Sequence, residues 1–335
     1  MVDRENVKNL EGVPSREADR SIPAAGQPTI RIRDVSRWYG EVLGVNKVTV
    51  DLYPGITGLV GPNGSGKSTL MNIICGILWP GQGAVTVLGQ PVRSNPDVRR
   101  EIGYCTQVDH FYESFTGVQF LESLLALHGR GKTWARKVAL DALEQVDLAG
   151  DKDRKIRTYS KGMRQRIKIA FALAHQPPVL ILDEPFNGLD PVGRHEMMRL
   201  FAGYAREGRT VLLSSHILHE IDQMTDRVLM MSNGYVMAEG GVREVRDILR
   251  QHPFQVYIRC QDARRLASLL LAEDNVRSIE IEDENSVTLA TRDPDLFYAR
   301  LNEVILEHDI LIDIVTLADE DVQSIYRYLA GREHH

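Results

Sequence analysis

The sequence predicts an α/β fold, and three observations lead to that prediction. Strand-like and helix-like patterns alternate from Thr29 to about Gly240. The apolar runs at residues 179–182 and 210–213 are continuous, as expected for parallel strands that are covered on both faces. A glycine-rich run, GPNGSGKS at residues 61–68, lies between a short strand and a helix and matches the pattern G-x-x-x-x-G-K-[ST]. Together they predict a P-loop NTPase core.

The elements of this core follow from local periodicity. Residues 29–35 and 45–52 alternate between apolar and polar side chains and are expected to be edge strands. The remaining strands are expected at residues 56–60, 85–88, 102–107, 179–182 and 210–213. Helices are expected from Thr69 and over residues 164–175. Apolar periodicity over residues 116–148 predicts a helical subdomain inserted into the α/β core.

After residue 253 the pattern changes. Strands are expected at residues 254–260, 276–281, 286–290 and 310–317, and helices at 263–271, 295–307 and 321–329. Apart from the last helix, this order is βαββαβ, a ferredoxin-like arrangement. We therefore expect three regions: a flexible N-terminal extension (1–28), a nucleotide-binding domain (29–250) and a small C-terminal α+β accessory or regulatory domain (251–335). None of the C-terminal residues suggests catalysis.

The composition excludes some classes of function. A chain of 335 residues with a net charge of −6 is not typical of a general nucleic-acid binder, so no nucleic-acid partner is expected. The three cysteines have no paired spacing, and we expect buried thiols in a reducing cytosol. No apolar stretch approaches the ~18 residues of a membrane helix, and a secretory pattern is lacking.

Residues 61–68 predict a phosphate site. Backbone N–H groups of such a loop point inward, and the N-terminus of the following helix adds positive potential. We expect Lys67 to reach the β- and γ-phosphates and the Ser68 hydroxyl to ligate Mg²⁺. The alternative, a glycine-rich turn that happens to contain Lys-Ser, does not explain the strand before it and the helix after it.

Acidic residues end one of the buried strands. Asp183 and Glu184 follow the apolar run at residues 179–182. A carboxylate at that edge of a parallel sheet, beside a phosphate loop, is placed to hold Mg²⁺. The second carboxylate would lie near the γ-phosphate and accept a proton from the attacking water. The alternative is a solvated acidic turn.

Three further polar residues gain meaning only in this context. His216 ends the next strand, where an imidazole can hydrogen-bond the γ-phosphate, although a lone histidine is more often structural. Gln107 ends another strand and offers an amide oxygen to Mg²⁺ or water, a weak signal by itself. Ser160 is a good N-cap for the helix that follows it. Its alternative role is a second phosphate site, which implies a second subunit.

The order of these motifs resembles that of ABC transporter ATP-binding subunits. The motifs are Tyr39, GPNGSGKS at residues 61–68, Gln107, YSKGM at 159–163, LILDEP at 180–185, GLD at 188–190 and SSH at 214–216. The resemblance covers residues 29–240. YSKGM, NGLDP and the small C-terminal domain are similar to the exporter-type branch related to the ABC-A subfamily.

The resemblance implies a role for each motif. Two subunits, expected to be identical, would enclose two ATP molecules head to tail, with Tyr39 stacked on adenine. The phosphates would be held by Gly61, Asn63, Gly64, Ser65, Gly66, Lys67, Ser68 and Thr69 of one subunit, and by Ser160 and Gly162 of the other, with Asp190 at the dimer seam. Mg²⁺ would be held by Ser68, Gln107 and Asp183, and catalysis would depend on Glu184, His216 and Gln107.

The resemblance also implies a location and a partner. Such a subunit is a cytoplasmic ATPase, peripheral on the membrane, that drives integral membrane permease subunits docked near residues 107–115. Two departures from the family are present. Lys161 and Met163 replace residues of the usual LSGGQ signature, and lysine there occurs in the resembled branch. Phe186 stands where a small or hydroxylated residue is more usual.

Three other functions fit parts of the sequence. A GTPase switch is suggested by D-x-x-G at residues 190–193, but the partial N-K-x-D at 46–49 ends in Thr49 and precedes the phosphate loop. A soluble ABC ATPase acting on DNA or ribosomes would usually carry a long coiled coil or two cassettes. A regulatory module that binds ATP without hydrolysing it would not need Glu184 and His216.

Overall fold

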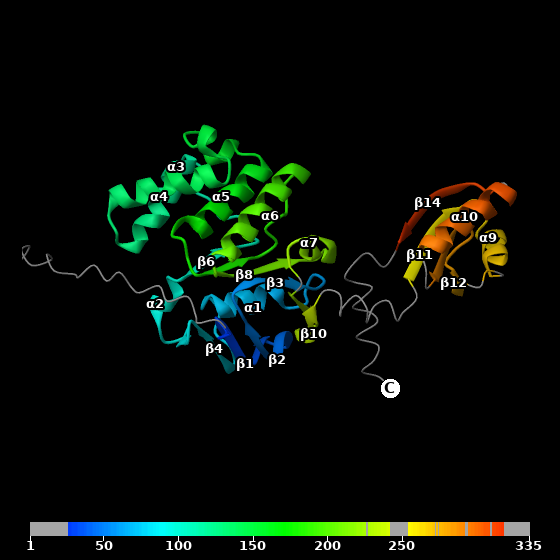
Figure 1. Ribbon diagram of the computed structural model, residues 1–335, viewed down its shortest axis with the longest axis horizontal. Helices are drawn as coiled ribbons and strands as arrows, with labels where there is room; N and C mark the ends of the chain where they lie inside the picture. Colours follow the sequence, from blue (N-terminus) through cyan, green and yellow to red (C-terminus); the bar gives the residue numbers. More distant parts are fainter. Residues whose placement is uncertain are drawn as a thin grey trace, which may run out of the picture.

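The computed structural model describes residues 26–225, 227–241, 254–271, 273, 275–291, 294–308 and 310–317. These residues form three β-sheets with helices packed against them (Figure 1). Most of the expected N-terminal extension, and the helix expected at residues 321–329, lie outside the described residues.

The central sheet has the strand order β10-β9-β3-β8-β7-β6. Its strands are β3 (Gly55–Val60), β6 (Ile102–Cys105), β7 (Val179–Leu182), β8 (Thr210–Ser215), β9 (Arg227–Ser232) and β10 (Tyr235–Gly241). All neighbours are parallel except β10, which runs antiparallel to β9. Every residue of β7 and β8 is buried, which explains their continuous apolar sequences. Because β3, β7 and β8 are parallel neighbours, their carboxyl ends meet at one edge.

A second, antiparallel sheet has the order β2-β1-β4-β5. Its strands are β1 (Ile30–Tyr39), β2 (Val42–Leu52), β4 (Gln82–Val87) and β5 (Gln90–Pro91). The prediction that residues 29–35 form an edge strand is wrong, because β1 pairs with β2 on one side and β4 on the other. It is also longer than expected, since register shifts after Ile32 and Val35 let the pairing continue to Tyr39.

Helices cover both faces of the central sheet (Figure 1). They are α1 (Lys67–Ile74), α2 (Pro96–Arg99), α3 (Gly117–Leu125), α4 (Lys132–Gln145), α5 (Lys161–Ala174), α6 (Pro191–Arg206) and α7 (Leu218–Asp222), with short 3₁₀ turns at Ala126–His128, Ala149–Asp151 and Ile156–Thr158. One core lies between α1, the antiparallel sheet and the central sheet. Another joins α3, α4, α5 and α6 to the opposite face. The two cores therefore hold the central sheet from both faces, including the edge where the carboxyl ends of β3, β7 and β8 meet.

The expected helical insertion is present as α3 and α4. Thr116 caps α3 by accepting a hydrogen bond from Gln119 N, and the Gln119 side chain returns one to Thr116 N. The helix expected from Arg164 begins one turn earlier, at Lys161. The reason is Ser160, whose Oγ accepts a hydrogen bond from Met163 N at 3.2 Å, so residues 161–163 form the first helical turn.

The C-terminal segment has the expected βαββαβ order and its own core. It comprises β11 (Phe254–Cys260), α9 (Ala263–Leu270), β12 (Val276–Ile281), β13 (Ser286–Thr291), α10 (Pro294–His308) and β14 (Ile312–Leu317). The antiparallel sheet order is β12-β13-β11-β14, as in a ferredoxin-like fold. Val256, Leu266 and Phe297 represent a core built only from residues of this segment.

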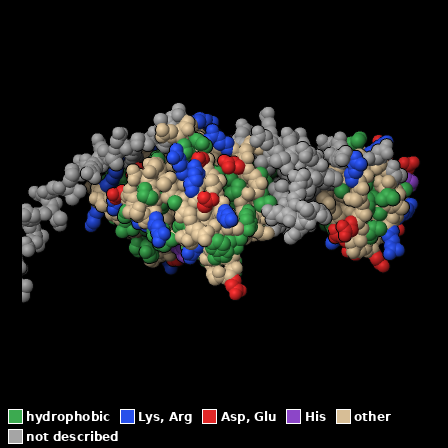
Figure 2. Space-filling model, turned by 90° about the horizontal axis from the view of Figure 1, so that it is seen from below, with side chains coloured by type: hydrophobic (Ala, Val, Ile, Leu, Met, Phe, Trp, Pro, Cys, Tyr) green, Lys and Arg blue, Asp and Glu red, His purple; other side chains and the backbone are tan. Residues whose placement is uncertain are grey.

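All three cysteines are free and buried, as expected. The face in Figure 2 carries Lys and Arg side chains and Asp and Glu side chains dispersed among apolar ones. Among the described residues, no helix is both long enough and apolar enough to span a membrane.

Candidate functional site

The phosphate loop connects β3 to α1 through a tight backbone path. Gly64 and Gly66 have φ angles of +80° and +102°, in the left-handed region that favours glycine. Gly66 is also the N-cap of α1, and a Cβ at this position would lie 2.4 Å from the carbonyl oxygen of Gly44. The loop therefore keeps its backbone exposed to a ligand, with the positive end of α1 behind it.

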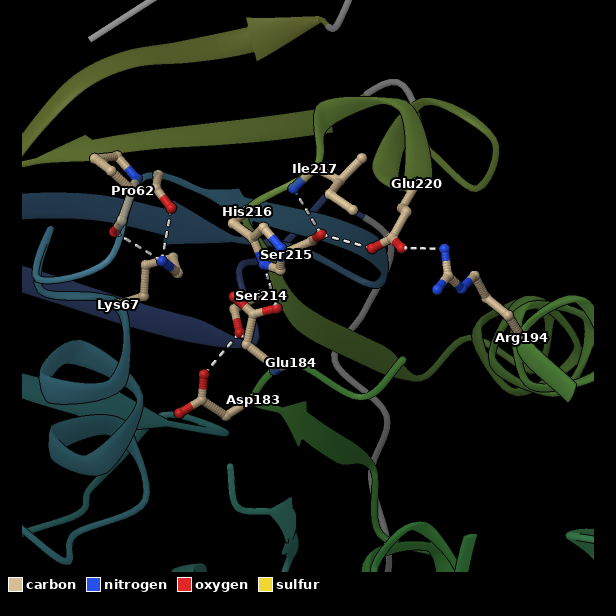
Figure 3. Close-up of polar contacts among 11 residues, drawn as sticks. Pro62, Lys67, Asp183, Glu184, Arg194, Ser214, Ser215, His216, Ile217 and Glu220 are labelled. Carbon is tan, nitrogen blue, oxygen red and sulfur yellow. Dashed lines mark hydrogen bonds and ion pairs between the residues drawn. The ribbon is translucent and has the colours of Figure 1, made fainter. Parts of the chain in front are cut away.

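Lys67 is the cation of this loop. The residue is buried, and its Nζ donates hydrogen bonds to the carbonyl oxygens of Gly61 and Pro62 at 2.6 and 3.0 Å (Figure 3). Burial lowers the pKa of the Lys67 ammonium, and the negative charges of Glu184 and Asp183 oppose that effect. Lys67 and both carboxylates line the same cavity.

A cavity of about 240 Å³ lies over the loop. Eleven of the sequence-predicted residues line it, namely Tyr39, Asn63, Gly64, Ser65, Gly66, Lys67, Ser68, Thr69, Gln107, Asp183 and Glu184, and Val42, Leu43 and Gly44 complete it. Within the described part of the chain, the buried Ser65 hydroxyl has no hydrogen-bond partner. The N-terminus of α1, a buried lysine and this hydroxyl fit a phosphorylated ligand.

Tyr39 stands at the rim of this cavity. Its ring is half-exposed, its hydroxyl lies 3.4 Å from Thr69 Oγ1, and the Arg37 guanidinium lies 5.5 Å from the ring centroid. A flat aromatic face beside a phosphate loop suits the base of a nucleotide. Tyr39 therefore lines the cavity, and its stacking on adenine stays a prediction.

Asp183 and Glu184 are fixed by a serine of the neighbouring strand. Ser214 Oγ donates to Asp183 Oδ1 at 2.7 Å and accepts a hydrogen bond from Glu184 N at 2.8 Å (Figure 3). Both acidic residues and Ser214 are buried. One hydroxyl therefore holds the carboxylate of Asp183 and the backbone of Glu184. Ser214 was part of the SSH motif, but its role was not predicted.

His216 contacts Glu184 and is not among the residues that line the cavity over the phosphate loop. Its Nδ1 lies 3.0 Å from Glu184 Oε2, and since a carboxylate accepts, the ring nitrogen donates (Figure 3). Glu184 has a φ of +50°, which is uncommon for a residue with a side chain. The sequence predicted separate roles for these residues, whereas the structure pairs them.

Gln107 lies two residues beyond the strand that was expected to end in it. β6 ends at Cys105, whose carbonyl accepts from Asp183 N at 2.9 Å. The following loop is held by Lys168 of α5, whose Nζ donates to the carbonyls of Thr106 and Gln107 at 3.2 Å each and pairs with Asp109 at 2.7 Å. The loop position therefore depends on α5, which sequence periodicity alone did not reveal.

The donors suit one Mg²⁺ ion together with phosphate oxygens. Ser68 offers a hydroxyl, Gln107 an amide and Asp183 a carboxylate, and all three line the same cavity. Mg²⁺ is usually bound by one or two carboxylates plus phosphate groups of the substrate. These residues therefore fit the ion.

Ser160, Gly162 and Asp190 lie outside the cavity of their own chain. Ser160 and Asp190 are exposed N-caps of α5 and α6, and Asp190 Oδ1 accepts from Gly193 N at 2.8 Å. A Cβ on Gly162 would lie 3.2 Å from the carbonyl of Gly188, so the signature loop and the 188–190 loop are neighbours. Asp190 and Gly193 of the D-x-x-G match thus form a helix cap.

Phe186 is explained by packing. It is buried, and its ring centroid lies 6.0 Å from that of Phe201 in α6. Gln165 of α5 holds the preceding residue by donating to the Pro185 carbonyl at 2.9 Å. A large apolar side chain at this position anchors the loop after Glu184 to α6.

Comparisons with known proteins indicate the family to which the chain belongs. The family model described as ABC transporter matches residues 45–187. The chain is 31% identical to the bacitracin transport ATP-binding protein BcrA of Enterococcus faecalis over 90% of this chain and 96% of BcrA. It is also 31% identical to the daunorubicin/doxorubicin resistance ATP-binding protein DrrA of Streptomyces peucetius, over 91% of this chain and 94% of DrrA.

Other matches cover the cassette alone. The chain is 35% identical to an ABC transporter ATP-binding protein of Nostoc sp., in a match that spans 62% of that protein's length. A dimeric ATP-binding cassette, MJ0796, in a post-hydrolysis state bound to ADP and Pi, superposes with a TM-score of 0.59 at 26% identity over 64% of this chain and 99% of that one.

This chain belongs to the ABC transporter family as an ATP-binding subunit, and it is an ATPase. The two relatives that match over nearly their whole length are named for transport and drug resistance. These names do not favour the alternative of a soluble ABC ATPase that acts on DNA or ribosomes. The finer resemblance to the ABC-A subfamily stays a prediction.

Proposed function

We propose that this chain is the ATP-hydrolysing subunit of a membrane exporter and that it works as a head-to-tail homodimer. The observation that supports a dimer is that the nucleotide-binding motifs lie in two separate places on one chain. Lys67 and Glu184 line the cavity, while Ser160 and Asp190 are exposed elsewhere on the same chain. A second copy turned by a two-fold axis would bring its Ser160 to this cavity.

Each residue then has a defined task in hydrolysis. The amides of Gly64 and Gly66 and the Lys67 ammonium bind the β- and γ-phosphates, and Tyr39 stacks on the base. Glu184 orients the attacking water and accepts its proton as the new oxygen–phosphorus bond forms and the bond to the β-phosphate oxygen breaks. His216 holds the Glu184 carboxylate. It would also hydrogen-bond the γ-phosphate when ATP is bound.

Ser68, Gln107 and Asp183 would hold Mg²⁺. When bound, the ion neutralises charge on the phosphate oxygens. Ser214 keeps Asp183 in place, and Lys168 keeps the Gln107 loop in place. Partner Ser160 and Gly162 would cap the γ-phosphate through a hydroxyl, a backbone N–H and the positive end of α5.

The membrane partner is proposed to dock beside the Gln107 loop. Val108 and Tyr112 are exposed there, next to the aromatic contacts of Phe111 and Phe115. Closing on ATP and reopening after hydrolysis would move this surface. We place the chain in the cytoplasm, peripheral on the membrane. Residues 29–250 form the ATPase domain, and 251–335 an accessory domain.

A pull-down tests the transporter assignment. The Glu184→Gln variant, expected to stay closed on ATP, would be recovered from native membranes with ATP and Mg²⁺, with a nucleotide-free sample as the matched control. A stoichiometric multi-span membrane protein in the ATP sample supports an exporter subunit. Recovery of soluble partners alone contradicts the membrane assignment and leaves the ATPase chemistry intact.

A further inference from the structure

Glu220 is a buried carboxylate that the hydrolysis scheme does not use. Its side chain is 9% exposed, and it is absent from the lining of the nucleotide cavity. A buried carboxylate is costly unless hydrogen bonds and an opposite charge compensate it. Both of its oxygens are occupied: Oε1 pairs with Arg194 Nη1 at 2.8 Å, and Oε2 accepts from Ser215 Oγ at 2.7 Å (Figure 3).

Ser215 connects Glu220 to the backbone around His216. Ser215 is the last residue of β8 and is fully buried. Its hydroxyl donates a hydrogen bond to Glu220 Oε2 and accepts one from Ile217 N at 2.9 Å. Both residues that flank His216 are thus held by one hydroxyl, and this fixes the backbone from which the imidazole reaches Glu184.

Arg194 connects Glu220 to the other end of the network. It lies in the first turn of α6, and its backbone N–H donates to the Asp190 carbonyl at 2.9 Å. A continuous path therefore runs from Asp190 through Arg194, Glu220 and Ser215 to His216. Any displacement of the Asp190 end of α6 moves the guanidinium that holds Glu220.

We propose that Glu220 is a positioning residue that couples the Asp190 end of α6 to the His216–Glu184 pair. The inference rests on the proposed function, in which Asp190 faces the second subunit. Docking of that subunit then sets the position of α6. Through Arg194 and Ser215, Glu220 passes this change on to His216 and places its imidazole as hydrolysis requires. Glu220 does not line the nucleotide cavity, so it is expected to act on turnover and not on binding.

The test compares kcat and KM for ATP in the full-length protein. Glu220→Gln keeps the shape but removes the charge that pairs with Arg194. It is expected to lower kcat by about tenfold to 100-fold, with KM within about threefold of the parent, because misplaced catalytic groups reduce turnover. Arg194→Gln should act likewise, and Arg194→Lys should restore most of kcat. The double variant Arg194→Gln/Glu220→Gln should be no worse than the worse single variant.

Glu196→Gln is the matched control, because Glu196 also lies on α6 but its carboxylate pairs with Arg166 at 2.7 Å and not with Glu220, Ser215 or His216. Its kcat should equal that of the parent. If the parent hydrolyses ATP and Glu220→Gln matches it, or changes only KM, the coupling is overturned while the proposed function stands. A parent without ATPase activity overturns the proposed function itself.

If Glu220→Gln does not fold, the Ser215→Ala variant tests the coupling instead. The substitution removes only the hydroxyl between Glu220 and Ile217 N. A lower kcat at an unchanged KM supports the coupling, and parental kinetics overturn it.

Discussion

Nδ1 of His216 lies 3.0 Å from Oε2 of Glu184, and this contact joins the ends of two neighbouring parallel strands. Glu184 is held at its backbone by Ser214 and at its carboxylate by His216. A carboxylate with few remaining degrees of freedom, beside a phosphate loop, is pre-organised to orient a water molecule. The loop after Glu184 is fixed in turn by Gln165 and Phe186.

The Glu184→Gln variant tests the general-base role. It should bind ATP within about threefold of the parent and lose about 100-fold or more of its turnover, because the amide does not accept the proton of water. With ATP and Mg²⁺ it should elute as a dimer. Steady-state ATPase assays and size-exclusion chromatography measure both effects, and turnover within a few-fold of the parent contradicts the role.

Removal of Mg²⁺ should abolish hydrolysis, and Asp183→Asn should act in the same direction. Asparagine retains an oxygen that can accept the Ser214 hydrogen bond but loses the charge that attracts the cation. We expect at least about tenfold lower turnover at saturating ATP and a higher Mg²⁺ requirement. A magnesium titration measures this. An unchanged half-saturating concentration excludes Asp183 as a ligand.

Gly103 is expected to tolerate no side chain. A Cβ there would lie 2.1 Å from the carbonyl oxygen of Ala172 and 2.7 Å from Pro177 Cγ, where β6 meets α5. Gly103→Ala should lower the free energy of unfolding by about 1–3 kcal/mol. Gly203→Ala is the matched control, since a Cβ on Gly203 in α6 meets nothing within 4 Å. It should stabilise the helix by about 0.5–1 kcal/mol.

Urea denaturation of both glycine variants measures whether the free energy of unfolding falls in Gly103→Ala and rises in Gly203→Ala. Equal stability of Gly103→Ala and the parent shows that β6 and α5 are less closely packed than described. The same outcome weakens the argument that α5 fixes the Gln107 loop.

Cys105 should make stability fall at alkaline pH. Burial raises the pKa of its thiol from 9.0 to about 12. A group whose pKa is raised on folding stabilises the native state below its unfolded pKa, and this contribution is lost as pH rises from about 9 towards 12. In that window the parent should lose up to about 1.4 kcal/mol per pH unit more than Cys105→Ala.

Denaturation curves of the parent and Cys105→Ala at pH 7.5 to 10.5 provide the measurement. Other titrating groups cancel in the difference between the two proteins. Identical pH slopes contradict a buried, protonated thiol.

The sequence predicted which residues line the cavity better than it predicted the residues that hold them in place. GPNGSGKS and LILDEP are local signals, so Lys67, Asp183 and Glu184 of one cavity were predicted without tertiary information. Lys168, Gln165 and Ser214 were missed because their partners are distant in sequence, such as Lys168 with Gln107 or Ser214 with Asp183. No periodicity marks such contacts.

The predicted ends of helices and strands were less accurate than the predicted motifs, and the structure shows why. Ser160 starts α5 one turn early because its hydroxyl satisfies Met163 N. β1 was predicted to be an edge strand because its alternation reports one buried face and says nothing about how many neighbours pair with it. The helix α6 and strands β9 and β10 were not predicted, although Asp190-Pro191 is a typical helix start.

The most direct test of the account uses mixed dimers of Ser160→Arg and Lys67→Ala, isolated through two different affinity tags. Each variant alone should be inactive, because both of its sites carry the defect. A mixed dimer should recover about half of the parental turnover, since one site then combines an intact Lys67 with an intact Ser160 from the other subunit. Mixed dimers no more active than either single variant would contradict a nucleotide site shared between two subunits.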